Sequence, residues 1–304
     1  MSINSKKRRD SKKAKVKVTR NSAPPKPPAL YQLDRLRKDY IKSWGINSDG
    51  HLAQGHYEWM AARVDGFPRT LEIGCGVGHS TLALLAQGHT VVCIEENPHC
   101  IAATQKRVAS HGYSVAVISR EKPESVGDNA YRLLYSDVEN APQVVCLLIE
   151  GDALNDPKLE AWLERQPKFD SIACWLLGTH DARGHNIAID LATMPTSHEH
   201  RIYVQNNVYE VADRILRPGG ILTVIDRTET PSTQALIEKT MEHHREQASV
   251  TSLVVQRVDH VPYVASEEKG AMPMLMTFAE DAQQSLMPGT VPTMSLCSTT
   301  SVKP

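Results

Sequence analysis

Residues 71–80 of the chain read LEIGCGVGHS. Three glycines stand there at alternate positions, after an apolar run and just before a helical pattern. Glycine has no Cβ and readily adopts positive φ, so the chain can turn sharply and a ligand can lie against its backbone amides. Residues 91–94 read as the next β-strand, and a carboxylate, Glu95, follows them. This order of strand, glycine turn, helix, strand and acid predicts a nucleotide half-site, in which the acid accepts hydrogen bonds from ribose hydroxyls.

The glycine spacing indicates which nucleotide is bound. The dinucleotide fingerprint G-x-G-x-x-G would place its third glycine at position 79, where this chain has His79. The spacing Glu72-x-Gly74-x-Gly76-x-Gly78 instead resembles motif I of the class I S-adenosylmethionine-dependent methyltransferases. S-Adenosylmethionine has no pyrophosphate, so it does not need a phosphate-binding helix N-terminus. A dehydrogenase remains an alternative that this spacing disfavours.

Four further segments follow in the order of that family's motifs. Asn97-Pro98 starts a helix, because Asn caps free amides and Pro is tolerated at the first helical position. Residues 144–150 form a buried type of strand that ends in Gly151-Asp152-Ala153, where the family supplies a carboxylate to the adenine amino group. Residues 169–177 resemble the fourth strand, at whose end the reactive methyl group lies. Residues 215–220, ILRPGG, resemble the turn into the fifth strand.

The resemblance implies an α/β fold, a three-layer sandwich around a mostly parallel seven-stranded sheet whose last strand is antiparallel. We expect an N-terminal helical cap over residues 30–64 and the methyltransferase domain over residues 65–281. An insertion at about 120–143, with an extra strand inside it, interrupts this domain. Residues 250–264 and 273–279 are expected to be its closing pair of strands.

The resemblance also implies the cofactor, S-adenosyl-L-methionine, and the residues around it. Glu95 is expected on the ribose hydroxyls and Asp152 near the adenine. The expected cofactor-binding residues are Glu72, Gly74, Cys75, Gly76, Gly78, Glu95, Glu96, Asp152, Ala153, Cys174 and Trp175.

The acceptor is expected beside the loop that follows the fourth strand, residues 178–186. Methyltransferases that act on bases or glutamine commonly carry Asn/Asp-Pro-Pro-Tyr/Phe just before it, whereas residues 174–177 here read CWLL. His180 and His185 are the candidate catalytic bases, because an unperturbed imidazole titrates near neutral pH. For each, a histidine with a purely local role is the alternative. Weaker substrate candidates are Tyr57, Arg183 and Asn186.

A metal ion is not expected at this loop. His198, His200 and Asp181 stand nearby in the sequence, but the histidine spacings do not fall on one helical face. Six cysteines contain no Cys-x-x-Cys pair and are interpreted as small core residues in a reducing compartment. No apolar run approaches the roughly 18 residues of a membrane span. We therefore expect a cytoplasmic protein.

Both ends of the sequence differ in composition from the rest. Residues 1–20 contain nine Lys or Arg and one Asp, a local charge of +8 in a chain of net charge −1. Such a segment cannot bury enough apolar surface to fold, so residues 1–29 are expected to be a disordered basic and Pro-rich tail. Contact of residues 1–20 with nucleic acid is one expectation and a solubilising terminus is the alternative. Residues 282–304 are also expected to be disordered.

Three functions remain open from these residues. The first is a methyltransferase that acts on an unidentified acceptor, taken to be a small molecule. The second is an RNA or protein methyltransferase that is recruited by the basic tail. The third is a non-catalytic subunit that binds S-adenosylmethionine and serves in assembly.

Overall fold

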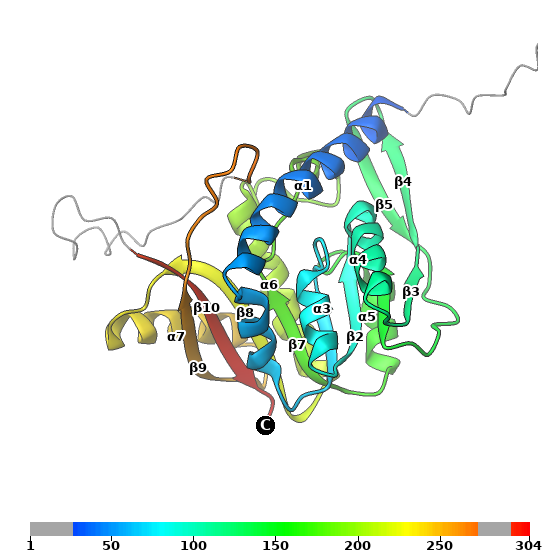
Figure 1. Ribbon diagram of the computed structural model, residues 1–304. Helices are drawn as coiled ribbons and strands as arrows, with labels where there is room; N and C mark the ends of the chain where they lie inside the picture. Colours follow the sequence, from blue (N-terminus) through cyan, green and yellow to red (C-terminus); the bar gives the residue numbers. More distant parts are fainter. Residues whose placement is uncertain (1–26, 273–292) are drawn as a thin grey trace, which may run out of the picture.

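A computed structural model describes residues 27–272 and 293–304 of the 304-residue chain. Its centre is an eight-stranded sheet with helices on both faces (Figure 1). The strand order is β3-β6-β2-β1-β7-β8-β10-β9. The sheet strands are β1 (Arg69–Ile73), β2 (Thr90–Glu95), β3 (Val115–Ile118), β6 (Cys146–Glu150), β7 (Phe169–Trp175), β8 (Leu216–Glu229), β9 (Val254–Pro262) and β10 (Met294–Val302).

The helices alternate with these strands. Ahead of β1 lie α1 (Pro28–Ala53), α2 (His56–Ala61) and the short 3₁₀ helix η1 (Ala62–Val64). The later ones are α3 (His79–Ala86), α4 (Pro98–Ser110), α5 (Pro157–Arg165), η2 (Asp181–His185), α6 (Ser197–Ile215) and α7 (Gln234–Ala248). Of the helices within residues 27–272 and 293–304, none is long and apolar enough to cross a membrane.

The sheet confirms the predicted architecture, with one more strand than expected. β10 pairs antiparallel with both β8 and β9, and the other pairings are parallel. This is the insertion of a last, reversed strand that the methyltransferase resemblance implies. The eighth strand is β3, which lies at the edge and pairs only with β6. Its four residues, VAVI, are all apolar and half-buried, and the run is shorter than the other strands of the sheet.

The expectation for the C-terminal residues was wrong. Residues 294–302 form β10, buried between two strands, whereas residues 282–304 were expected to be disordered. The domain therefore extends beyond residue 281. The strand expected at 273–279 lies outside the described residues. β10 is rich in Ser and Thr, which gave it a polar appearance in the sequence.

The expected insertion is a β-hairpin. β4 (Glu121–Val126) and β5 (Ala130–Tyr135) pair antiparallel as a separate two-stranded sheet. The hairpin packs against α1 (Figure 1). The expected extra strand is therefore present as β5. It is joined to a second strand that the polar sequence of residues 121–126 did not indicate.

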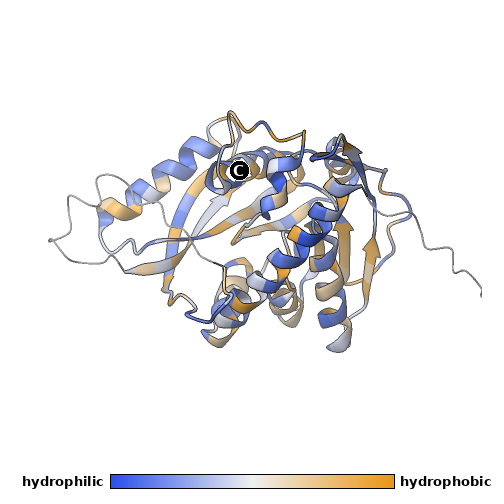
Figure 2. Cartoon of the chain, turned by 90° about the horizontal axis from the view of Figure 1, so that it is seen from above, coloured by the Kyte–Doolittle hydropathy of each residue, from blue (hydrophilic) through white to orange (hydrophobic). Residues whose placement is uncertain are grey.

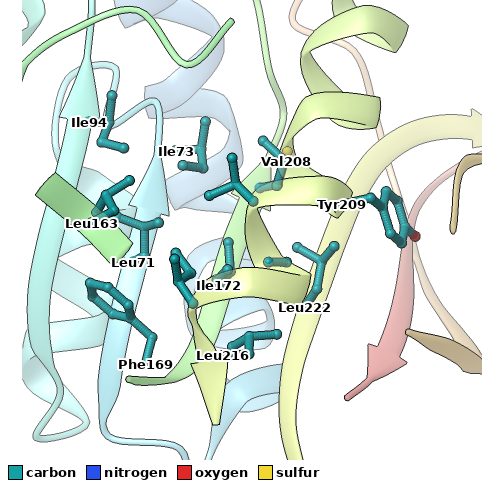
Figure 3. Close-up of a cluster of buried hydrophobic side chains, with 14 of the residues drawn as sticks. Leu71, Ile73, Ile94, Leu163, Phe169, Ile172, Val208, Tyr209, Leu216 and Leu222 are labelled. Carbon is teal, nitrogen blue, oxygen red and sulfur yellow. The ribbon is translucent and has the colours of Figure 1, made fainter. Parts of the chain in front are cut away.

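The hydrophobic core has one part on each face of the sheet. Side chains of α5 and α6 pack on one face, against residues such as Leu71, Ile172 and Leu222 (Figure 3). Side chains of α2, α3 and α4 pack on the other face, around Val91 and Leu148. Hydrophobic colour is concentrated on the strands in the view from above (Figure 2). The cores hold the strands rigidly, so the residues at their carboxyl ends are well positioned for a site.

Capping residues begin several helices as the sequence predicts. The Asn97 side chain accepts a 3.0 Å hydrogen bond from the amide of His99 at the start of α4. Asp156 does the same for α5, and Thr196 with Glu199 forms a capping box for α6. α1 begins at Pro28, two residues before the expected start of folded structure.

Candidate functional site

A cavity of about 1090 Å³, its open mouth included, lies where β1, β2, β6 and β7 end. Parallel strands bring their carboxyl ends to one edge of a sheet, and this is the usual place for a ligand in such folds. Many of the residues predicted from the sequence border this cavity. They are Tyr57, Gly74, Cys75, Gly76, Glu95, Glu96, Asp152, Ala153, Trp175, His180, Arg183 and Asn186.

Three predicted cofactor residues do not border it. Glu72 is buried under the glycine turn, where it accepts hydrogen bonds from Ser80 and Thr81. Gly78 packs on α4, and a Cβ built there would lie 2.9 Å from the Cα of Thr104. Cys174 is buried in the hydrophobic core. These three residues therefore support the glycine turn and the sheet and do not line the cavity.

His185, one of the two candidate bases, also lies outside the cavity. Its Nε2 is 3.0 Å from the side-chain nitrogen of Gln32 on α1. His180, five residues earlier, is buried and borders the cavity. The short η2 helix separates the two imidazoles, so only His180 remains placed for acid–base chemistry.

Glu95 lies at the end of β2 and faces the glycine turn. Its carboxylate accepts hydrogen bonds from the amide of Gly76 (3.2 Å) and from the amide of Asn97 (2.9 Å). Burial raises the pKa of Glu95 to about 7, although these two amides oppose the change. The carboxylate therefore needs further donors to hold its charge, and a pair of vicinal hydroxyls would supply them.

Asp152 follows β6 on the same side of the cavity. Its two oxygens accept hydrogen bonds from the amide of Leu154 and the side chain of Asn155. Burial also raises the pKa of this carboxyl group. Glu95 and Asp152 thus place two acceptors at neighbouring strand ends, as the family resemblance implies.

Glu96 is in a different electrostatic environment from its neighbour Glu95. It forms an ion pair with Arg37 of α1, and its Oε2 makes a 2.7 Å hydrogen bond with His180 Nε2. Burial opposes ionisation, but the Arg37 guanidinium and the His180 imidazole lower the pKa of Glu96 to about 2. Arg37 is only 3% exposed and also pairs with Glu121 of the hairpin. These pairs tie α1, the hairpin and the end of β2 together.

The pairing with Glu96 defines the tautomer of His180. An ionised carboxylate only accepts hydrogen bonds, so Nε2 of His180 carries a hydrogen and donates it. In the neutral imidazole Nδ1 then has a free lone pair. Among the described residues this buried Nδ1 has no hydrogen-bond partner. Glu96 therefore orients an imidazole whose second nitrogen is buried and has no hydrogen-bond partner among the described residues.

Helix α1 covers the cavity, in keeping with the expected helical cap, but the sequence did not reveal which of its side chains border the cavity. Tyr40 and Trp44 lie one turn apart on this helix and both border the cavity. A Cβ built on Gly76 would lie 2.5 Å from Trp44 Nε1, and one built on Gly178 would meet the Tyr40 hydroxyl. The space in front of Gly76, which was expected to hold a ligand, is thus occupied by Trp44. The helical spacing of α1 predicted packing but not what it packs on.

The side of the cavity where the acceptor was expected is formed by η2, the loop after it and α6. Arg183 and Asn186 border it together with Ile189, His200 and Val204. Burial and the nearby Arg183 charge lower the pKa of His200 to about 4, so this imidazole is neutral. His200 had been considered only as a metal ligand. Its helical position, four residues before Val204 on α6, is the signal that would have placed it beside the cavity.

Comparisons with known proteins give similarity of fold only. No family model and no curated protein matches the chain. Solved structures that resemble it include the N-methyltransferase NodS from Bradyrhizobium japonicum in complex with S-adenosyl-L-homocysteine. The TM-score is 0.46 and the identity 11%, over 91% of this chain and 99% of NodS.

Two other structures show how diverse this group is. TrmN from Thermus thermophilus has a TM-score of 0.43 and 11% identity over 82% of this chain. The match covers 48% of TrmN, so the present chain spans about half of its length. The [4+2]-cyclase SpnF has a TM-score of 0.42 and 16% identity, over 82% of this chain and 79% of SpnF. Similarity at this level does not indicate what the present chain binds or does.

Proposed function

We propose that the protein is a class I S-adenosylmethionine-dependent methyltransferase that acts on a small-molecule acceptor. The observation that carries this proposal is the meeting of the glycine turn with two strand-end carboxylates, Glu95 and Asp152, at one cavity. Glu95 would accept the ribose hydroxyls and Asp152 the adenine amino group. When bound, the cofactor supplies an electrophilic methyl group on a sulfonium, which becomes a neutral thioether once the methyl group is transferred.

The charge of the cavity favours this cofactor over a dinucleotide. Glu95, Glu96 and Asp152 all border the cavity, and the Arg37 charge beside them is already paired. Acidic groups repel a pyrophosphate but stabilise a sulfonium and an ammonium group. Aromatic rings in the lining, such as Tyr40 and Tyr57, add faces on which a cation is stabilised.

His180 is the proposed general base. It borders the cavity at the end of β7, and Glu96 holds its Nε2–H so that Nδ1 is free to accept a proton. A hydroxyl or amine acceptor loses a proton as it is methylated, and His180 would take that proton. Glu96 would stabilise the resulting imidazolium.

The cover formed by α1 supports a small acceptor. Tyr40 and Trp44 close on the loops at the strand ends, and buried ion pairs of Arg37 hold the helix there. A polymer would need an open groove along the sheet edge. A cavity beneath a helix suits a molecule that is enclosed as a whole, because water must be excluded around the nucleophile.

Two measurements test the proposal. Calorimetry with full-length protein should show binding of S-adenosylmethionine and S-adenosylhomocysteine, and no tighter binding of NAD. Incubation with methyl-labelled cofactor and a cell extract should then place label in the metabolite fraction. Tighter binding of NAD would overturn the cofactor assignment. Cofactor binding with no labelled product in the metabolite, RNA or protein fraction would favour the non-catalytic alternative.

A further inference from the structure

Arg183 is a cation in the cavity lining that has no acidic partner. It lies on η2, three residues after His180, and its amide donates a 3.1 Å hydrogen bond to the His180 carbonyl. The guanidinium donates to the carbonyls of Met194 (3.0 Å) and Pro195 (3.2 Å). Among the residues that the structure describes, no carboxylate oxygen lies within 4.0 Å of it.

The two carbonyls leave most of the donor capacity of Arg183 unused. A guanidinium carries five N–H groups, and the two carbonyls accept one from each terminal nitrogen. These contacts fix the plane of the group but do not neutralise its charge. The closest acidic groups in its own region are Asp181, which is exposed, and Glu199, whose carboxylate caps α6 through Thr196.

The other side chains that face this part of the cavity do not supply the missing charge. Ile189 and Val204 are apolar and His200 is neutral. Asn186 Oδ1 already accepts a hydrogen bond from the amide of Ala188. Across the cavity, the Glu96 carboxylate is paired with Arg37 and His180. A half-buried, oriented cation in such surroundings is stabilised by an anion that arrives with the ligand.

We propose that Arg183 binds an acidic group, a carboxylate or a phosphate, on the small-molecule acceptor. This inference rests on the proposed function and names the chemical class of its substrate. Arg183 lies on η2 only three residues after His180, which caps that helix, so the acid and the methylated group must lie close together on the same molecule. The acceptor is therefore a compact acid that carries a hydroxyl or amine. Its acid is bound by Arg183 while the hydroxyl or amine faces His180.

Binding of simple probes tests this inference without turnover. Full-length protein is titrated by ligand-observed NMR with benzoate, phenyl phosphate and the neutral isostere benzamide. We expect at least one acid to bind about tenfold or more tightly than benzamide, the scale of one charge-assisted hydrogen bond. Whether benzoate or phenyl phosphate binds more tightly distinguishes a carboxylate from a phosphate.

Variants assign the preference to the charge of Arg183. Arg183→Gln should abolish the preference for the acid, and Arg183→Lys should keep part of it. Arg245→Gln is the matched control, because Arg245 pairs with Glu238 and Glu242 on the exposed face of α7. The Arg245→Gln variant should prefer the acid over benzamide as strongly as the wild type does. Thermal unfolding of each variant checks that the loop at Met194 and Pro195 is intact.

Three results would overturn the inference. They are equal affinity for acid and amide, no acid binding at millimolar concentration, and a preference that survives Arg183→Gln. A separate titration with S-adenosylhomocysteine distinguishes this failure from failure of the proposed function. If the wild-type protein binds S-adenosylhomocysteine but shows no preference for the acid, only the assignment of Arg183 is overturned. Failure to bind S-adenosylhomocysteine would overturn the cofactor assignment. Binding of an acid at Arg183 would then still be judged from the titration with benzoate and phenyl phosphate.

Discussion

Adjacent carboxylates at the end of β2 have opposite electrostatic environments. Glu95 accepts hydrogen bonds from two backbone amides and a weak one from the Cys75 thiol, and its pKa is raised to about 7. Glu96 is held by Arg37 and His180, and its pKa is lowered to about 2. Near neutral pH, Glu96 is therefore ionised while Glu95 titrates. The pKa values of Glu72 and Glu121 are also raised to about 7, so the contribution of Glu95 to the pH response is identified by replacing it.

The affinity for S-adenosylhomocysteine should rise with pH through about 7. Below that value the free protein holds Glu95 protonated, and a protonated carboxyl group is a poorer acceptor for two hydroxyls. The ionised form binds better, so affinity falls as pH drops from 8 to 6. Calorimetry at several pH values measures this slope. Glu95→Gln should lower affinity by about 1–3 kcal/mol and flatten the slope.

Glu72→Gln is the control for that experiment. Burial raises the pKa of Glu72 to about 7 as well, but its carboxylate bonds to Ser80 and Thr81 and does not border the cavity. This variant should keep the pH dependence of binding. An unchanged slope in Glu95→Gln would remove Glu95 from the ribose site.

Replacement of His180 tests the proposed base. His180→Ala should reduce turnover by roughly 10²–10⁴-fold, while the affinity for the cofactor changes little. His185→Ala is the matched control and should retain turnover, because His185 lies outside the cavity beside Gln32. Wild-type turnover in His180→Ala would indicate an acceptor that is already nucleophilic and is only aligned by the enzyme.

Sequence reasoning located some of these residues and could not locate others. Glu95 and Asp152 follow strands directly, so their position at the sheet edge could be predicted from the order of elements. Arg37 lies on a helix far away in the sequence, and its pairing with Glu96 depends on where α1 docks. Choosing between His180 and His185 required the path of η2, which local sequence does not determine.

At the scale of elements, the glycine turn has two distinct neighbours. Gly76 faces the movable side chain of Trp44, and Gly78 faces the backbone of α4 at Thr104. Both glycines have positive φ, 51° and 86°, so any side chain adds strain. The same substitution should therefore have different consequences at the two positions.

Gly78→Ala should destabilise the protein, whereas Gly76→Ala should mainly disturb the site. A Cβ at position 78 would push α4 away from the turn, which should lower the melting temperature by several degrees. A Cβ at position 76 would displace Trp44 and weaken cofactor binding. Thermal unfolding and calorimetry on both variants check this. If Gly76→Ala lost as much stability as Gly78→Ala and bound the cofactor as tightly as the wild type, the turn would have a purely structural role.

The helical cover and the hairpin show what element prediction can achieve. The spacing of apolar residues in α1 and the insertion at 120–143 both predicted real elements. A helical cap was expected, but the contacts that dock α1 and the hairpin could not be predicted, because they depend on single long-range pairs such as Arg37 with Glu121. Long-range pairs of this kind leave no periodic pattern in the sequence.

At the scale of the whole molecule, β10 completes the sheet. Its backbone pairs with strands on both sides, and two of its hydroxyls have partners, since Ser295 bonds to Thr230 and Ser301 to Tyr209. The hydroxyls of Ser298 and Thr300 are buried with no hydrogen-bond partner among the described residues. The polar composition of β10 therefore suggested a disordered tail, whereas the two backbone ladders place it inside the sheet.

Truncation after residue 292 should abolish cooperative folding. The deletion would leave the facing edges of β8 and β9 without the backbone partners that β10 provides. The truncated protein should be insoluble or lack a cooperative thermal transition by circular dichroism. A soluble truncated protein with wild-type melting temperature would contradict the role of β10.

Deletion of residues 1–20 should leave the fold and methylation intact and change only the binding of nucleic acid. Nine basic residues lie in this segment, so its removal should lower nucleic-acid affinity and flatten the salt dependence of binding. Methylation of a small acceptor should continue unchanged. No binding of nucleic acid by the full-length protein at low salt would remove the support for an RNA substrate.

The position of β10 also has a consequence for synthesis. About 65 residues separate the end of β8 from the start of β10, so at ~5–20 residues per second the ribosome needs roughly 3–13 s to make them. Until β10 has been made, the edge of β8 that it will cover has one row of amides and carbonyls unpaired, a template for pairing with other nascent chains. The sheet can close only after translation reaches Val302, and until then chaperones have an exposed edge to protect.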